Sequence, residues 1–124
     1  MKIIAIILAA GRGTRVGSAI PKQWQHLGNK RIIDHSIDLF KNISRINNVM
    51  VVLHPDDLHL LNRSDVLFTK GGNTRSESVK FGLDALKQNE MPDYVLIHDA
   101  ARPTTPLTVI NNVLDNLDTA DAVS

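Results

Sequence analysis

Glycines and cations gather directly after an apolar run near the start of the chain. Residues 6–10 are apolar, and the segment that follows contains Gly11, Arg12, Gly13, Arg15 and Gly17, with Pro21-Lys22-Gln23 close behind. Glycines allow backbone N–H groups to turn inward and form an anion-binding nest. Arg15 and Lys22 add full positive charges near the same place. The segment therefore predicts a polyphosphate site, and the alternative is an ordinary turn after a buried strand.

The spacing of these glycines separates the loop from two better-known phosphate loops. The dinucleotide fingerprint is G-x-G-x-x-G, whereas Gly11, Gly13 and Gly17 are spread over one residue more. Pro21 would also interrupt a helix that began directly after the loop. The P-loop needs a lysine after its last glycine, but Gly17 is followed by Ser18. A phosphate loop of another type is therefore expected.

Three blocks resemble a family of sugar-phosphate nucleotidyltransferases, the 2-C-methyl-D-erythritol 4-phosphate cytidylyltransferases. The first block, Ala9–Gly17 with Pro21-Lys22-Gln23, is similar to the family pattern A-A-G-x-G-x-R-x-G and P-K-Q. The second, Gly71–Val79, resembles G-G-x-x-R-x-x-S-V, and the third, His98–Pro103, resembles H-D-A-A-R-P. The sister family that acts on ribitol 5-phosphate tends to have A-G-G and H-D-A-V-R at the first and third blocks. Ala10 and Ala101 therefore favour the erythritol family.

The resemblance implies nucleotidyl transfer, which needs no covalent nucleophile; the sequence offers no Ser-His-Asp or Cys-His arrangement. The acceptor's phosphate would attack the α-phosphorus of CTP in line and expel pyrophosphate, so the protein must hold two anions together and neutralise developing charge. Mg²⁺ would bridge the phosphates, because it binds largely through substrate oxygens. The resemblance assigns the catalytic role to Arg15 and Lys22. The resemblance also implies that Ala9, Ala10, Gly11 and Gly13 bind the nucleotide through its phosphates.

The second block would hold the base. Gly71 and Gly72 let the backbone approach a flat ring, and the resemblance implies that Gly72, Asn73 and Ser78 bind cytosine. Asn73 departs from the acidic or small residues often found there, which is harmless if its backbone makes the contact. The alternative for Ser78 is a solvent-facing serine on a helix. Ala100, in the third block, is also assigned to the nucleotide.

Asp99 and Arg102 belong to the acceptor in this interpretation. Asp99 would hydrogen-bond a polyol hydroxyl or a metal-bound water, and Arg102 would contact the acceptor or form an ion pair with Asp99. The alternative is a turn-capping aspartate beside a surface arginine; a carboxylate at a strand's carboxyl end favours a functional role. The histidines show no metal-binding spacing, so no metal site besides a water-mediated contact at Asp99 is expected. His98 and Trp24 are expected to pack.

Alternating strands and helices must position these blocks. Apolar and β-branched runs predict strands at residues 2–8, 49–53, 66–69 and 94–97. Helices are predicted at residues 31–41 and 57–62, after the capping box Thr74–Glu77, and from an N-cap at Thr105 with Pro106 at the first helical position to about Leu117. This alternation is typical of an α/β fold, here a Rossmann-like, doubly wound, mostly parallel sheet of nucleotidyltransferase type. Ligands bind at the carboxyl ends of such strands, so the three blocks should share one edge.

Composition narrows the function classes. The chain has 124 residues, a net charge of +1 and no cysteine. These values indicate one domain, argue against a nucleic-acid or membrane surface, and exclude disulfides and thiolate metal sites. No apolar stretch reaches about 20 residues, and the apolar start is short and followed at once by glycine and Arg12. A cytoplasmic protein is therefore expected.

The last residues, Ala120–Ser124, have the pattern of a further strand. Chains of the resembled family continue for about as long again, and that part supplies acceptor-phosphate residues and an arm that reaches into a partner subunit. Residues 1–124 are therefore expected to form a single, truncated nucleotidyltransferase domain, homodimeric in the full-length family, with impaired turnover alone. Three hypotheses follow: a cytidylyltransferase for 2-C-methyl-D-erythritol 4-phosphate or ribitol 5-phosphate, a CTP-binding chain without turnover, and a dinucleotide oxidoreductase that the glycine spacing disfavours.

Overall fold

A parallel sheet forms the centre of the protein, whose computed structural model describes residues 1–12, 20–89 and 91–117. Within those residues the sheet has the strand order β5-β4-β1-β6, and every neighbouring pair is parallel. The strands are β1 (Ile3–Ala9), β4 (Asn48–Leu53), β5 (Leu67–Lys70) and β6 (Tyr94–Asp99). Each lies within two residues of its predicted bounds. In β1 and β4 the continuous apolar run is what a strand covered on both faces requires.

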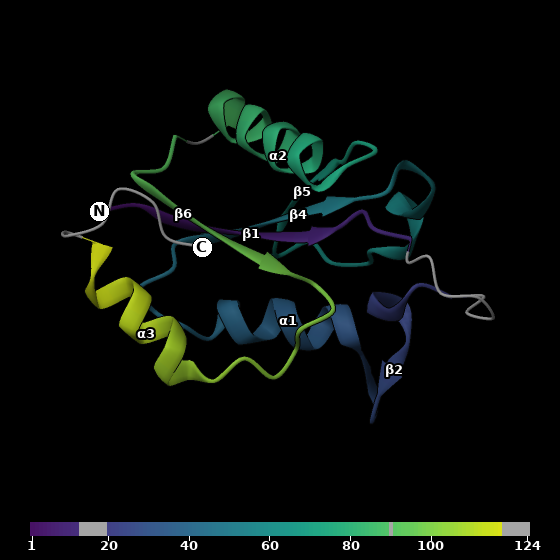
Figure 1. The fold of residues 1–124 in the computed structure, drawn as a ribbon, viewed down its shortest axis with the longest axis horizontal. Helices are drawn as coiled ribbons and strands as arrows, with labels where there is room; N and C mark the ends of the chain where they lie inside the picture. The colour runs from purple at the N-terminus through teal and green to yellow at the C-terminus, as the bar shows by residue number, and fades with distance from the viewer. Residues whose placement is uncertain (13–19, 90, 118–124) are drawn as a thin grey trace.

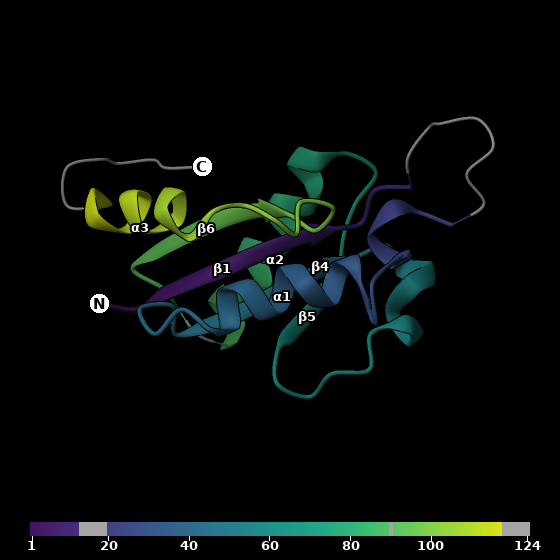
Figure 2. The same cartoon turned by 90° about the horizontal axis from the view of Figure 1, so that it is seen from below.

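Helices cover both faces of the sheet. The helix α2 (Arg75–Asn89) lies on one face, and α1 (Ile32–Lys41) and α3 (Leu107–Asp115) lie on the other (Figure 1). Figure 2 shows the same layers from below, with α1 running alongside β1. This arrangement confirms the predicted doubly wound α/β fold. None of the helices in the described part of the chain combines the length and apolar character that a membrane span requires.

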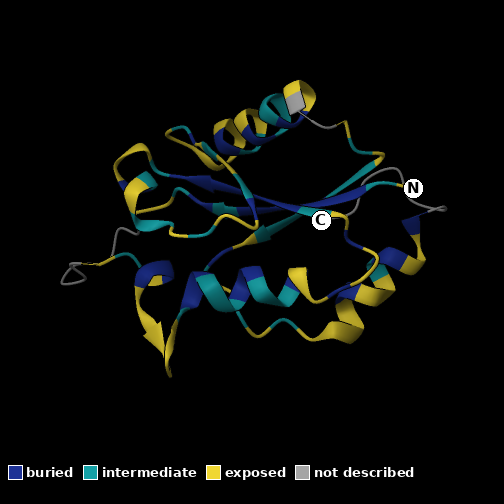
Figure 3. Ribbon diagram, turned by 180° about the vertical axis from the view of Figure 1, so that it is seen from behind, coloured by how far each residue is buried: buried dark blue, intermediate teal, exposed yellow. Residues whose placement is uncertain are grey.

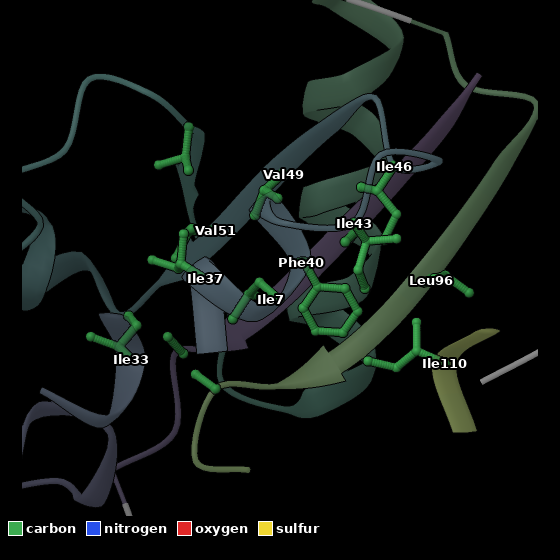
Figure 4. Close-up of a cluster of buried hydrophobic side chains, with 14 of the residues drawn as sticks. Ile7, Ile33, Ile37, Phe40, Ile43, Ile46, Val49, Val51, Leu96 and Ile110 are labelled. Atoms are coloured by element: carbon green, nitrogen blue, oxygen red, sulfur yellow. The ribbon is translucent and has the colours of Figure 1, made fainter. Parts of the chain in front are cut away.

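The strand β1 is buried on both sides because its residues alternate between two apolar clusters. Ile3, Ala5 and Ile7 join the cluster with Ile37 and Phe40 of α1, part of which Figure 4 shows. Ile4 and Ile6 belong to the second cluster, on the side of α2. In Figure 3 the central strands are accordingly buried, whereas the outer faces of the helices are exposed. The sheet is thus a rigid base for the loops at its carboxyl edge.

Short elements depart from the sequence prediction. The strands β2 (His26–Leu27) and β3 (Lys30–Arg31) form a small antiparallel hairpin around Gly28, whose φ of +72° suits glycine. Two such short strands carry no periodicity, so they were not predicted. The predicted helix at residues 57–62 is a 3₁₀ helix, η2 (Pro55–Leu60), which begins earlier because the side chain of His54 accepts a hydrogen bond from Asp56 N.

Two helix starts also differ in detail. The predicted N-cap at Thr105 is wrong by one residue: Pro106 is the N-cap of α3, which begins at Leu107. At α2 the capping box is confirmed in one half, because Thr74 Oγ1 accepts from Glu77 N at 3.1 Å. The reciprocal bond goes one residue further out, since Glu77 Oε1 accepts from Asn73 N at 3.0 Å. The cap therefore orders the loop before the helix as well as the helix itself.

Candidate active site

Three loops begin at the carboxyl edge of the sheet, on the right of Figure 1, where a pocket of about 240 Å³ lies between the first two loops and the end of β6. The loops follow β1, β5 and β6, as the sequence blocks predict. The pocket is lined by Leu8, Ala10, Gly11, Gly72, Asn73, Thr74, Arg75, Ser78 and Asp99. The start of α2 also opens onto it, and the first N–H groups of a 15-residue helix favour an anion there.

Gly71 and Gly72 are glycines because the backbone passes too close to its neighbours for a side chain. A Cβ at Gly71 would lie 2.6 Å from Ser78 Oγ and 2.7 Å from Ala10 Cβ. A Cβ at Gly72 would lie 2.5 Å from Glu77 Cβ. All three distances are shorter than van der Waals contact allows. This close approach joins the first and second blocks into one wall of the pocket.

Ser78 holds that wall in place. It is 3% exposed, and its Oγ accepts a hydrogen bond from Gly72 N at 3.2 Å. The alternative of a solvent-facing helix serine is therefore wrong. Ser78 also lines the pocket, so a direct contact with the base stays a prediction beside this structural role. Asn73 is exposed at the rim, where its N–H is engaged by Glu77.

Asp99 lies where two pockets meet. It lines the 240 Å³ pocket and a neighbouring one of about 390 Å³ between β6, α1 and α3, which Arg102 also lines. Asp99 Oδ1 accepts from Ala101 N at 2.9 Å, and Arg102 N donates to the carbonyl oxygen of Asp99 at 3.0 Å. No ion pair joins the side chains of Asp99 and Arg102 in the described part of the chain. The guanidinium is therefore available to an anion.

Lys22 lies apart from the base-side pocket. It is exposed in η1 (Lys22–Trp24) and lines a hollow of about 500 Å³ together with Arg102 and residues 103–105. The structure thus brings Lys22 to Arg102 and not to Gly72 or Ser78. Gly13 and Arg15 lie outside the described residues, so their predicted roles at the phosphates stay predictions.

Ala9 and Ala100 are buried next to the pocket residues Ala10 and Asp99 in the chain. Ala9 is 2% exposed and Ala100 is fully buried, and neither lines the pocket. Ala100 N donates to Leu8 O at 2.9 Å, and its carbonyl accepts from Ser36 Oγ at 2.8 Å. Their role in nucleotide binding stays a prediction, and their observed contacts are with the protein itself.

His98 packs as predicted. Its ring lies 4.8 Å from that of Phe40, and Nε2 is 2.7 Å from Arg102 O, which identifies Nε2–H as the donor. Burial lowers the pKa of His98, so the ring is neutral at neutral pH. It thus supports the backbone that carries Arg102. Among the described residues, no three histidine or carboxylate side chains gather in a way that could hold a metal ion.

Two supporting residues were missed from the sequence. Gln23 is buried, and its Nε2 donates to Ala9 O at 3.1 Å and Gly11 O at 2.8 Å. Asp57 is buried and accepts from Trp24 Nε1 at 3.0 Å, which confirms a packing role for Trp24. The sequence contained one signal for the role of Asp57. Arg12 and Asp57 have opposite charges, and they follow β1 and β4, which are neighbours in the sheet.

Comparison with known proteins gives one consistent family. Residues 3–124 match the family model described as IspD: 2-C-methyl-D-erythritol 4-phosphate cytidylyltransferase. The chain is 43% identical over 127 residues to the 2-C-methyl-D-erythritol 4-phosphate cytidylyltransferase of Roseobacter denitrificans, covering 100% of this chain and 57% of that protein. It is 45% identical over 122 residues to the bifunctional enzyme IspD/IspF of Rhodobacter capsulatus, covering 96% of this chain and 31% of that protein.

Solved structures agree. The fold superimposes on the Francisella tularensis 2-C-methyl-D-erythritol 4-phosphate cytidylyltransferase with a TM-score of 0.76 at 28% identity, covering 98% of this chain and 54% of that one. The bifunctional IspDF of Campylobacter jejuni gives a TM-score of 0.82 at 26% identity, covering 98% of this chain and 32% of that one. The chain therefore spans between a third and somewhat over half of the length of these relatives.

Proposed function

The chain belongs to the 2-C-methyl-D-erythritol 4-phosphate cytidylyltransferase family, and from that premise we propose that it binds CTP and serves cytidylyl transfer to 2-C-methyl-D-erythritol 4-phosphate. One observation carries the proposal: the loops after β1 and β5, the start of α2 and the end of β6 line one pocket at the carboxyl edge of the sheet. That is where open parallel sheets bind nucleotides. A CDP-alcohol and pyrophosphate would be the products.

The pocket suggests how the donor would lie. Gly72, Asn73 and Ser78 form a closely packed wall that would contact a pyrimidine ring. A purine is larger and would contact this wall differently. Ala10 and Gly11 begin the loop that would cradle the phosphates, with Gly13 and Arg15 further along. The N–H groups at the start of α2 would add partial positive charge. These features favour a nucleoside triphosphate over a neutral ligand.

The acceptor would approach from the side of Arg102. Lys22 and Arg102 line one hollow, so a phosphate there would lie between two cations. In the proposed step an oxygen of the acceptor phosphate forms a bond to the α-phosphorus. The bond from that phosphorus to the oxygen bridging toward the β-phosphate breaks, and pyrophosphate leaves with the electron pair. Catalysis then consists of aligning two anions and neutralising charge in the transition state.

Mg²⁺ belongs to the same proposal. Asp99 is the carboxylate among the residues that line the pocket. Its Oδ1 accepts a hydrogen bond from Ala101 N, whereas Oδ2 has no hydrogen-bond donor among the described residues. One carboxylate with phosphate oxygens is a donor set that Mg²⁺ accepts, directly or through water. The ion would supply positive charge at the phosphates, while Asp99 would orient it or a hydroxyl of the polyol.

A titration series tests the proposal. CTP with Mg²⁺ should bind by calorimetry and raise the melting temperature by several degrees, since a ligand at 100 times its Kd adds about 2.7 kcal/mol of stability. ATP and GTP should bind about tenfold more weakly or worse. Absence of CTP binding by a folded sample would overturn the proposal, and equal binding of the three would remove the base assignment.

Turnover separates the remaining alternatives. Pyrophosphate release with 2-C-methyl-D-erythritol 4-phosphate, compared with ribitol 5-phosphate, identifies the acceptor. CTP binding with no release would identify a CTP-binding chain without turnover. We also propose that the protein is a homodimer, which sedimentation would measure. Its proposed location is the cytoplasm, which cell fractionation would test.

A further inference from the structure

Asp57, in η2, is a carboxylate almost entirely removed from water. The residue is 4% exposed. A charged carboxylate in such a place destabilises a protein strongly unless it is paired and hydrogen-bonded. Its partners therefore indicate what the position serves.

The partners of the Asp57 carboxylate among the described residues both lead to the start of the nucleotide loop. Arg12 Nη1 lies 3.0 Å from Asp57 Oδ1 and 3.1 Å from Oδ2, and Arg12 directly follows the pocket residue Gly11. Trp24 Nε1 donates to Asp57 Oδ2 at 3.0 Å. Trp24 directly follows Gln23, whose amide donates to the carbonyl oxygen of Gly11. Two separate connections thus run from one carboxylate to the same glycine.

The sheet itself cannot hold this part of the loop. The register of β1 against β4 ends with Ala9 opposite Leu53, so the chain leaves the ladder at Ala10. Beyond that point the described contacts of Gly11 and Arg12 come from Gln23, His54, Asp56 and Asp57. Arg12 Nη2 donates to His54 Nδ1 at 2.8 Å, and His54 Nδ1 also accepts from Asp56 N. The loop after β4 therefore forms the support of the loop after β1.

We propose that Asp57 is a positioning residue for nucleotide binding: through Arg12 and through Trp24 with Gln23 it fixes the backbone at Gly11, where the phosphate loop begins. Arg12 is then a structural cation of this loop, distinct from the phosphate-binding Arg15 and Lys22. The inference rests on the proposed function, because phosphate binding is what the fixed backbone would serve. A displacement of such a loop by about 1 Å is enough to weaken binding and catalysis severely.

The test compares Asp57→Asn with Asp38→Asn. Asp38 is likewise a carboxylate held by cations, Lys30 and Arg63 at 2.8 Å each, but it is only partly buried and lies on α1 away from the pocket. The ¹⁵N order parameters of the Gly11 and Arg12 backbone should fall in Asp57→Asn and stay unchanged in Asp38→Asn. The Kd for CTP with Mg²⁺ should rise about tenfold to a hundredfold in the first variant only.

A double variant keeps the test decisive if Asp57→Asn is poorly folded. Arg12→Gln with Asp57→Asn leaves no buried charge unpaired, so it should recover most of the lost stability. Its order parameter at Gly11 should still be lower than that of the unaltered chain, because the two-point contact is gone. Unchanged order parameters at Gly11 and Arg12 in both variants would overturn the inference. Unaltered protein that fails to bind CTP would instead overturn the proposed function, and the order parameters would still decide the role of Asp57.

Discussion

At the scale of single residues, the pocket is built from side chains that serve the backbone. Ser78 and Gln23 both use their polar atoms on main-chain groups of the loops, Gly72 N and the carbonyls of Ala9 and Gly11. Such contacts fix the conformation of the loop backbone before a ligand arrives, which lowers the entropy lost on binding. Lys22 and Arg102 are the exposed cations of the neighbouring hollow.

Ser78→Ala should weaken CTP binding and lower the free energy of unfolding by about 1–2 kcal/mol, because Gly72 N loses its partner in a buried place. Calorimetry and urea unfolding measure the two effects. Ser76→Ala is the matched control, since Ser76 is an exposed serine of the same helical turn. Equal effects of the two substitutions would contradict the role assigned to the Ser78 hydroxyl.

Lys22→Ala should reduce turnover of an active preparation about a hundredfold while leaving the melting temperature nearly unchanged, because the exposed ammonium contributes charge at the phosphates rather than packing. Lys22→Arg should restore only part of the rate, since a forked guanidinium differs in shape from an ammonium. A coupled pyrophosphate assay measures both. Lys80→Ala, an exposed lysine on α2, is the control; full activity of Lys22→Ala would show that the catalytic cation lies elsewhere.

At the scale of elements, the site depends on how closely α2 approaches the strand ends. Gly71 N donates to Leu53 O at 2.7 Å, which carries the β4–β5 pairing one residue past β5. The chain then turns directly into the cap of α2, formed by Thr74 and Glu77. Gly71 and Gly72 therefore allow the end of β5, the cap and the start of α2 to pack closely together.

Gly71→Ala should destabilise the fold by about 1–3 kcal/mol, because the added methyl would overlap Ser78 Oγ and Ala10 Cβ. Gly11→Ala is the comparison for stability, since a Cβ there meets nothing within 4 Å. Thermal unfolding of both variants measures the difference. A Gly71→Ala protein as stable as Gly11→Ala would show that the β5–α2 junction relaxes easily.

At the scale of the whole molecule, an ion network ties α1 to the segment before β5. Arg63 pairs with Asp34, Asp38 and Asp65, and Lys30 pairs with Asp38. The hydrogen bond from Arg63 lowers the pKa of Asp65 to about 2. Burial alone would raise the pKa of Asp38, but hydrogen bonds from Lys30 and Arg63 outweigh it and the pKa is lowered. These contacts hold α1 against the segment that leads into the edge strand β5.

The network should make stability fall with acid. A carboxylate whose pKa is lower in the folded state stabilises the protein above its unfolded pKa, and that stabilisation is lost as pH falls through the folded pKa. Unfolding free energy should therefore decline between about pH 5 and pH 2. Arg63→Gln should flatten this decline, whereas Arg45→Gln, which removes an exposed pair with Asp115, should not. Urea titrations at several pH values measure the slopes; identical slopes would contradict the assignment.

The sequence alone determined the layered fold and the edge at which the site lies. The apolar run of β1 and the helical spacing of Ile33, Ile37 and Phe40 are local patterns, and local patterns specify which faces are buried. Parallel strands then bring their carboxyl ends together, so the blocks after β1, β5 and β6 had to meet. The family followed from the same blocks, because their order and spacing are specific.

Only the tertiary structure decided which side chains face the pocket and which support it. Ser78 is buried because the backbone at Gly71 and Gly72 passes close to it, and Ala9 and Ala100 are buried as well. The connection of Asp57 to Arg12 joins residues 45 apart in the chain. Such contacts depend on how loops that follow different strands pack together. The hydrophobic periodicity of the sequence does not predict them. Side-chain roles at this edge are therefore a property of the assembled fold.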